Sequence, residues 1–339
     1  MSATALFWSL AALAFALGAV VGSFLNVVIY RVPAEQSVVS PGSRCPSCET
    51  PIAWYDNIPI LSWIFLRARC RHCQASISVR YPFIEALMGL LSLGLWLKIA
   101  ARPFRIFEAQ PIADPTVLPW TSLAVAFGLY FVFLAILVAI TFVDLDHYLI
   151  PHEFTLPGIA LGVLAAYLLN HDGLMAPGAL HGLFPPVSLV SSIVGVVVGG
   201  GVIILLFYLY FAARGIQGLG GGDVTMMALM GAWLGWPALI FIFFAASIQG
   251  LIAAGLGALF GAGFLKDSEE ILAADAPDGG DDVATDGDSP GGDAADEEAP
   301  QGGLAVPFGP FIALAGLQFF FVGEFLPDWL AMTYIYYGP

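Results

Sequence analysis

Two aspartates stand out because each lies at the edge of a long apolar segment. Asp144 follows an apolar run in "TFVDLDHYLIPHEFTLP", and Asp223 follows a run of glycines in "GLGGGDVTMMALMG". A carboxylate is costly in such a place unless it faces the interior of a helix bundle or a water-filled cavity, so each is a candidate functional residue. Two carboxylates in one site of low dielectric constant share a proton, and such a pair can activate water for aspartic proteolysis.

The glycines before Asp223 suggest room for a substrate. Gly220, Gly221 and Gly222 have no side chains, so a peptide backbone can approach the acid closely, and we expect them to bind substrate. A phosphate-binding loop is the competing interpretation, but the required Lys and Ser/Thr do not follow these glycines. Asp146 lies two residues beyond Asp144, faces another side of a helix, and is a lesser candidate.

The four cysteines form two pairs, CPSC (Cys45 and Cys48) and CRHC (Cys70 and Cys73), with 21 residues between the pairs. The two-residue gap lets both thiolates of a pair bind one ion, and two pairs complete a closed tetrahedral zinc site. Two disulfides, or a redox or iron–sulfur role, are the alternatives. His72 is expected to face solvent because four sulfurs already fill the coordination shell.

The elements that must position these residues are membrane helices. Hydrophobic residues make up 59% of the 339-residue chain, and several apolar runs are about 20 residues long, which is enough to span a bilayer. The first run is too long for a removable signal peptide and is expected to be a retained helix. The expected spans are 5–30, 83–100, 119–142, 154–170, 188–213, 224–236, 238–262 and 304–326, of which the sixth is short.

We therefore expect an all-α polytopic membrane protein of about eight transmembrane helices, with a small cytoplasmic zinc-ribbon-like domain between the first two. Six arginines lie in the loop between these two spans, and this excess of positive charge predicts that the loop is cytoplasmic. Alternation of the spans then places Asp144 and Asp223 at the cytoplasmic face, where they can meet. Arg102 and Arg105, expected outside, are exceptions. The six arginines are Arg31, Arg44, Arg67, Arg69, Arg71 and Arg80.

The formal net charge of −15 comes largely from one tract, Asp267 to Glu298, which holds half of the 26 acidic residues. It has few large apolar residues, so we expect a disordered solubilising loop, with calcium or partner binding as the alternative. We expect no nucleic-acid partner. The predicted division is 1–30 (first transmembrane helix), 31–82 (cytoplasmic four-cysteine zinc-binding domain), 83–265 (membrane core with both aspartates), 266–303 (acidic cytoplasmic loop) and 304–339 (last transmembrane helix and tail).

In combination, these motifs make the chain similar to the bacterial type IV prepilin peptidases, which are bifunctional leader peptidases and N-methyltransferases with a GxGD-type aspartic site. The resemblance covers nearly the whole chain. It rests on "GSFLNVVIYRVP", the two CxxC pairs followed by "RYPFIEAL", "VDLDHYLIPHEFTLP", the element from Gly220 to Asp223, "GAWLGW" and "PFGPFIAL". Each of these motifs is weak alone, and together they are specific.

The resemblance implies that Asp144 and Asp223 are the catalytic pair, at the cytoplasmic face of the bacterial inner membrane. It implies that prepilins and pseudopilins are cut just after a leader glycine, and that S-adenosylmethionine then methylates the new N-terminal residue. Membrane lipids are the other expected partners. The four-cysteine domain distinguishes bifunctional members from peptidase-only relatives. No glycine-rich methyltransferase fold is recognisable, so no S-adenosylmethionine contact is assigned.

Polar residues where the chain enters and leaves the four-cysteine domain are possible methyltransferase-associated residues. These are Asn26, Arg31, Arg80 and Glu85. Glu85 has two other interpretations, since it could reach the membrane interface or pair with Arg80.

The sequence departs from the family pattern in three places. Thr225 stands where the family usually has a lysine, His152 stands where an Asp or Asn usually follows the proline, and the acidic loop is an addition. His152 and Glu153 are expected to be solvated residues at the start of a span.

Two other functional classes are compatible with the composition. One is an ion-conducting transporter and the other is a non-catalytic membrane scaffold, each with the zinc site as a docking module. A conduction path requires polar groups through the depth of the spans, whereas both aspartates lie at one face, so the sequence favours proteolysis.

Overall fold

The computed structural model of the protein describes residues 2–108, 118–171, 185–214, 221–260 and 307–326. The predictions for Gly220, for the acidic loop 266–303 and for the tail beyond 326 lie outside the described residues. Within the described part of the chain, regular secondary structure is helical, and the β-structure consists of two isolated bridges.

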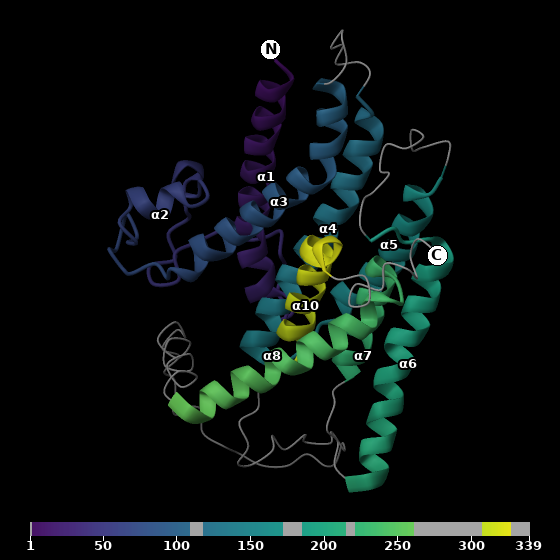
Figure 1. The fold of residues 1–339 in the computed structure, drawn as a ribbon. Coiled ribbons are helices and arrows are strands. Elements are labelled where there is room, and N and C mark those ends of the chain that lie inside the picture. The colour runs from purple at the N-terminus through teal and green to yellow at the C-terminus, as the bar shows by residue number, and fades with distance from the viewer. Residues whose placement is uncertain (1, 109–117, 172–184, 215–220, 261–306, 327–339) are drawn as a thin grey trace, which may run out of the picture.

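The helices pack into one body, with α2 and the loops around it at one side (Figure 1). In chain order they are α1 (Ala3–Arg31), η1 (Trp54–Asp56), α2 (Leu61–Phe65), α3 (Arg80–Glu108), α4 (Trp120–His147), α5 (His152–Leu169), α6 (Leu189–Arg214), α7 (Gly221–Leu234), α8 (Ala238–Phe260), α10 (Gly309–Val322) and η3 (Gly323–Phe325).

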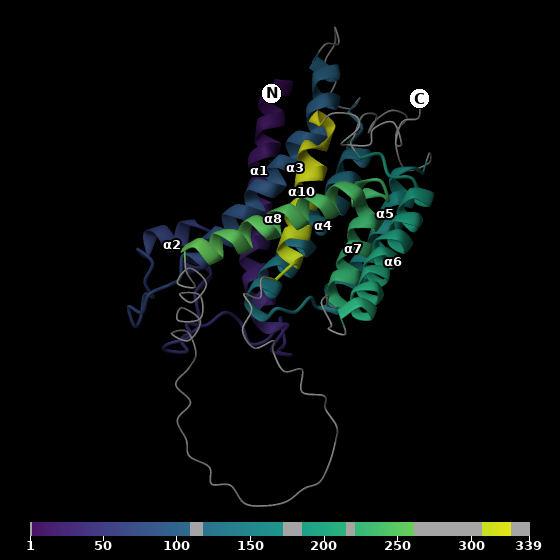
Figure 2. The same ribbon diagram turned by 60° about the horizontal axis from the view of Figure 1, so that its bottom comes forward.

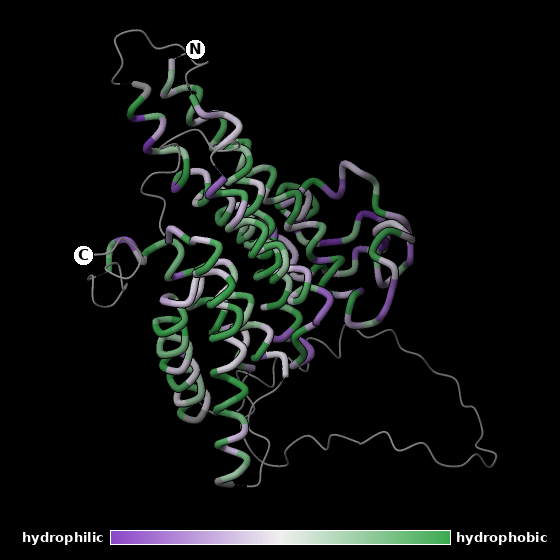
Figure 3. The backbone as a smooth tube through the Cα atoms, turned by 90° about the vertical axis from the view of Figure 1, so that its right-hand side faces the viewer, coloured by the Kyte–Doolittle hydropathy of each residue, from purple (hydrophilic) through white to green (hydrophobic). Residues whose placement is uncertain are grey.

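Each of the eight expected spans overlaps one of these helices, but the spans expected at 224–236 and 304–326 correspond to the short helices α7 and α10. Of the described helices, six are long and apolar enough to cross a membrane, namely α1, α3, α4, α5, α6 and α8. Most of their turns are hydrophobic, whereas hydrophilic residues gather in the irregular loops beside them (Figure 3). The shorter helices α7 and α10 have 14 residues each. The predicted all-helical membrane protein with a cysteine cluster between the first two spans is confirmed.

One boundary differs from the sequence prediction in a way that matters for the site. α4 does not end near residue 142 but continues to His147, where Tyr148 caps it in the left-handed conformation and donates its backbone N–H to the Asp144 carbonyl at 2.9 Å. Asp144 and Asp146 therefore belong to the last turns of a helix, which fixes their directions, rather than to the loop that follows.

Glycines allow the closest helix contacts. A Cβ atom added at Gly18 would lie 2.5 Å from the Met88 carbonyl oxygen, and one added at Gly22 would lie 2.7 Å from the Glu85 Cα. The backbones of α1 and α3 thus touch, as at small-residue crossings in membranes. Gly195 on α6 meets the backbone of Gly231 on α7 in the same way.

The core forms around α7, which is buried on most of its circumference. α5, α6 and α7 form one group, and α10 lies against α4 and α8 (Figure 2). Trp233 of α7 stacks on Phe133 of α4 with ring centroids 4.8 Å apart, and its indole N–H donates to the Gly158 carbonyl at 2.9 Å. A helix that is apolar on all sides requires such surroundings.

An ion pair with one buried partner lies just beyond the C-terminal end of α10. Lys98 of α3 has a side chain that is only 6% exposed, and its Nζ lies 3.7 Å from Glu324 Oε1 and 5.3 Å from the centre of the Phe320 ring. The sequence analysis did not single out this lysine because it lies within an apolar span. The Lys98 side chain is buried whereas Glu324 lies at the partly exposed edge in η3, so the pair links η3, directly after α10, to α3.

Candidate active site and metal centre

Asp144 and Asp223 come together at one end of the helix bundle. Asp144 lies in the last turn of α4 and is 4% exposed, and Asp223 lies in the first turn of α7 and is 9% exposed. The two carboxylates are close enough for their charges to act on each other. The fold thus juxtaposes the two acids that the sequence analysis selected, although they are far apart in the chain.

A third segment, which the sequence analysis left without a role, completes the surroundings of Asp144. Gly309 begins α10, and a Cβ added there would collide with the Asp144 Oδ2 and lie 3.0 Å from Ile150 Cδ1. Ile150 is buried in the link between α4 and α5. The glycine followed by a proline in "PFGPFIAL" is typical of a helix start, but it does not indicate which residue this helix start contacts.

The ends of three helices meet at this place, since α4 ends where α7 and α10 begin. The N-terminus of a helix carries a partial positive charge and unpaired backbone N–H groups, which stabilise a nearby carboxylate. The two N-termini therefore offset part of the cost of burying two acids together, and they can also bind the oxygen of a polarised carbonyl group.

The glycines before Asp223 differ in their surroundings. Gly222 packs against Ile150, whose Cβ would lie 2.7 Å from an added Cβ, whereas an added Cβ at Gly221 would meet open space. Gly222 is thus needed for packing, whereas an added Cβ at Gly221 would contact none of the described residues. Thr225 donates its hydroxyl to the Gly222 carbonyl at 2.9 Å, so it closes the first turn of α7 rather than supplying the missing cation.

The polar residues at the base of the four-cysteine domain contact other parts of the protein. The Asn26 side-chain amide donates to the Tyr81 carbonyl at 3.3 Å, and Arg31 donates to the Ser37 carbonyl at 2.9 Å. Glu85 is buried and accepts a hydrogen bond from the Ile60 backbone N–H at 2.6 Å.

Arg80 does not pair with Glu85, which was one interpretation of the sequence. Its guanidinium instead forms an ion pair with Asp146 of α4. At the start of α5, His152 and Glu153 are exposed, as expected for solvated residues.

The four cysteines form a compact cluster in which all four Sγ atoms lie within 4.8 Å of one another, and they are free thiols. The Cys45 and Cys73 Sγ atoms are 3.7 Å apart, which matches the separation of about 3.8 Å expected between sulfurs bound to one tetrahedral zinc ion. The donor set and its geometry therefore fit a metal ion.

Each pair of cysteines lies in a similar turn. Cys45 accepts at its carbonyl from the Glu49 N–H at 2.9 Å, and Cys70 accepts in the same way from the Gln74 N–H at 3.1 Å. One isolated antiparallel β-bridge flanks each turn, Arg44 with Pro51 and Arg69 with Ser76. The two turns face each other and supply two sulfurs each.

Hydrogen bonds lower the pKa of two of these thiols, whereas burial and the neighbouring thiols raise that of Cys73. Contacts with the side chain and then the backbone of Thr50 lower the pKa of the Cys48 thiol to about 6. The backbone N–H groups of Cys73 and His72 lower the pKa of the Cys70 thiol. A thiol with a lowered pKa loses its proton to a metal ion more readily.

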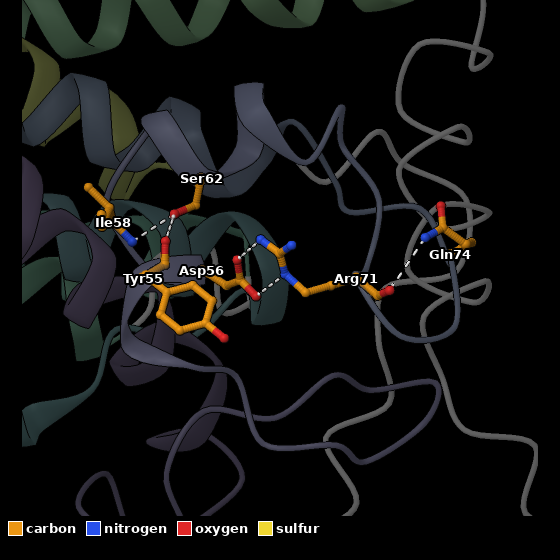
Figure 4. A network of polar contacts seen from close by, with 6 residues as sticks. All are labelled: Tyr55, Asp56, Ile58, Ser62, Arg71 and Gln74. Carbon is orange, nitrogen blue, oxygen red and sulfur yellow. Dashed lines mark hydrogen bonds and ion pairs between the residues drawn. The ribbon is translucent and has the colours of Figure 1, made fainter.

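A polar network connects the second cysteine pair to η1 (Figure 4). Arg71 donates to both carboxylate oxygens of Asp56, at 2.7 and 2.5 Å. Ser62 of α2 accepts from the Ile58 backbone N–H at 2.8 Å and donates to the Tyr55 carbonyl at 3.1 Å. The domain is thus held by polar contacts in addition to the cysteine cluster.

Comparison with known proteins shows which families the chain is similar to. Residues 16–99 match the model of the bacterial peptidase A24 N-terminal domain, and residues 131–255 match that of the type IV leader peptidase family. No solved structure matches.

Among curated relatives, a prepilin leader peptidase/N-methyltransferase of Myxococcus xanthus (strain DK1622) is 33% identical over 92% of this chain and 90% of its own length. The protein of that name from Aeromonas hydrophila is 30% identical over 97% of this chain and 96% of its own length. The one from Neisseria gonorrhoeae is 36% identical over 71% of this chain and 80% of its own length. These relatives support aspartic peptidase and methyltransferase activity, and the chain belongs to the type IV leader peptidase family.

Proposed function

We propose that the chain cleaves prepilins and pseudopilins just after the leader glycine, with Asp144 and Asp223 as the catalytic pair. The observation that supports this best is the burial of both carboxylates at the meeting of three helix ends. Buried acids in a membrane protein are costly and are kept mainly for function. The names of the relatives point to the same substrates.

In the proposed mechanism the two aspartates share one proton. The ionised carboxylate removes a proton from a water molecule as the water oxygen attacks the scissile carbonyl carbon, and the protonated carboxylic acid hydrogen-bonds the carbonyl oxygen. When the tetrahedral intermediate collapses, a proton passes to the leaving amine nitrogen and the C–N bond breaks. The space beside Gly221 would hold the substrate backbone near both acids.

We further propose that this site faces the cytoplasm of a bacterial inner membrane. The six arginines from Arg31, the last residue of α1, to Arg80, the first residue of α3, support this orientation, because cytoplasmic loops retain positive charge. Prepilin leaders would then meet Asp144 and Asp223 from the side on which prepilins are made.

For the four-cysteine cluster we propose a structural zinc ion held by Cys45, Cys48, Cys70 and Cys73. A bound ion would join the two cysteine turns and so contribute to the folding of this domain.

The methylation activity of the relatives suggests that this chain also methylates the new N-terminus, with S-adenosylmethionine as methyl donor. Arg31 lines an open surface pocket together with Phe24, Val27 and Val39, of which Phe24 and Val39 are exposed. A guanidinium beside an apolar wall suits a ligand that has both a carboxylate and a flat ring, so Arg31 is the first of the four polar candidates to test.

The test is to incubate the purified full chain in detergent with a prepilin, with and without S-adenosylmethionine, and to weigh the products by mass spectrometry. We expect a loss of the leader mass, and a gain of one methyl group only with S-adenosylmethionine. Asp144→Asn and Asp223→Asn should each abolish cleavage, while Glu153→Gln, an exposed acid near the same end, should not. Cleavage by either Asn variant at the wild-type rate would refute the assignment.

A further inference from the structure

Asp146 is a partly buried acid that the proposed mechanism does not use. It lies two residues beyond Asp144 on α4, so its side chain points to a different side of the helix. Its side chain is 15% exposed and forms an ion pair with Arg80, the first residue of α3. An acid in this position needs an explanation, because a carboxylate at the C-terminus of a helix faces the negative end of the helix dipole.

Arg80 makes more than one contact with α4. Its guanidinium lies over the Phe142 ring, 5.5 Å from the ring centre, and pairs with Asp146 one turn further along the same side of the helix. Phe83 of α3 packs edge-on against Phe142 with ring centroids 6.3 Å apart. The first turn of α3 thus packs against the last two turns of α4, on the side opposite the aspartate pair.

The same turns of α3 also hold the four-cysteine domain. Glu85, five residues after Arg80, accepts a hydrogen bond from the Ile60 backbone N–H at 2.6 Å. Ile60 has a φ of 64°, a backbone conformation that a residue with a side chain rarely adopts, and the Glu85 contact helps to hold it. α3 therefore lies between the domain and the helix that bears Asp144.

We propose that Arg80 and Asp146 are positioning residues for the peptidase reaction: their ion pair fixes the last turn of α4 and so holds Asp144 in register with Asp223. Arg80 also balances the charge of Asp146, a third acidic residue near the two buried aspartates, and supplies the positive charge that the C-terminus of α4 favours. This inference rests on the proposed peptidase function. It assigns the pair no contact with the substrate.

The experiment compares prepilin cleavage by wild type, Arg80→Gln, Asp146→Asn and the charge-exchanged variant Arg80→Asp with Asp146→Arg. A displacement of Asp144 predicts a kcat about 10- to 100-fold lower in each single variant, with KM within about twofold of the wild-type value. The charge-exchanged variant should recover at least part of the lost kcat. Arg105→Gln, the same substitution at an exposed position of the same helix, should leave kcat unchanged.

Two further measurements separate positioning from a general loss of structure. The metal content of each variant should match that of wild type. In a double-mutant cycle, removing both charges together should lower the midpoint of thermal unfolding by less than the sum of the decreases in the two single variants. This cycle needs no substrate, so it tests the ion pair even if wild type fails to cleave prepilin, a result that would instead refute the proposed function. The inference is overturned if folded single variants cleave at the wild-type rate, or if KM alone changes.

Discussion

A single methyl group at Gly309 offers a sharp test of the site geometry. In Gly309→Ala the new Cβ would lie 3.0 Å from Ile150 Cδ1 and would collide with the Asp144 carboxylate. Carbon atoms in contact prefer about 3.5–4.0 Å, so Ile150 must move by roughly 0.5–1 Å and Asp144 must turn away. A displacement of about 1 Å at a reacting group can lower the rate about 100-fold, while overpacking costs about 1–3 kcal/mol of stability.

The assay is the kcat of prepilin cleavage in detergent, with the midpoint of thermal unfolding measured on the same sample. Gly201→Ala is the matched control, because an added Cβ there meets open space on α6, and alanine is otherwise the better helix former. We expect the control to cleave normally and Gly309→Ala to lose most of its activity while it remains folded. Normal cleavage by Gly309→Ala would refute the placement of α10 against Asp144.

Three further predictions concern stability. Cys73→Ser should lower the bound zinc, measured by atomic absorption, and should lower the unfolding midpoint of the chain, because three sulfurs leave the tetrahedral site incomplete. Glu324→Gln should destabilise the chain by about 1–3 kcal/mol, since it leaves Lys98 buried without its partner; combining it with Lys98→Met should recover part of the loss, and an additive result would argue against the pair. Gly195→Ala should destabilise by about 1–3 kcal/mol in a thermal unfolding assay, because its methyl group meets the backbone of Gly231; an unchanged midpoint would contradict the crossing of α6 and α7.

Features with a local signal could be predicted from the sequence. Apolar runs became helices with bounds that agree within several residues, since hydrophobic length determines a membrane helix. The spacing of Cys45, Cys48, Cys70 and Cys73 indicated a shared site because each pair needs only a short turn.

Contacts between distant segments were harder to predict. Nothing near Gly309 in the chain shows that it meets Asp144, because a glycine of this kind is required by the approach of another helix. The partner of Arg80 was also missed: Glu85 is close in sequence, whereas Asp146 becomes the neighbour only when α3 and α4 pack together. Such pairs depend on tertiary structure, which hydrophobic periodicity does not encode.

The crossing of α1 and α3 also constrains the four-cysteine domain as a unit. The contact between Gly22 and Glu85, with the hydrogen bond from Asn26 to Tyr81, brings the end of α1 close to the start of α3. Residues 32–79 thus form a closed loop whose two ends are held together by the membrane helices. The packing of these helices therefore offsets much of the conformational entropy that is lost when the loop closes. In this sense the domain is an enlarged turn of a helical hairpin, and its folding is coupled to the assembly of that hairpin in the bilayer.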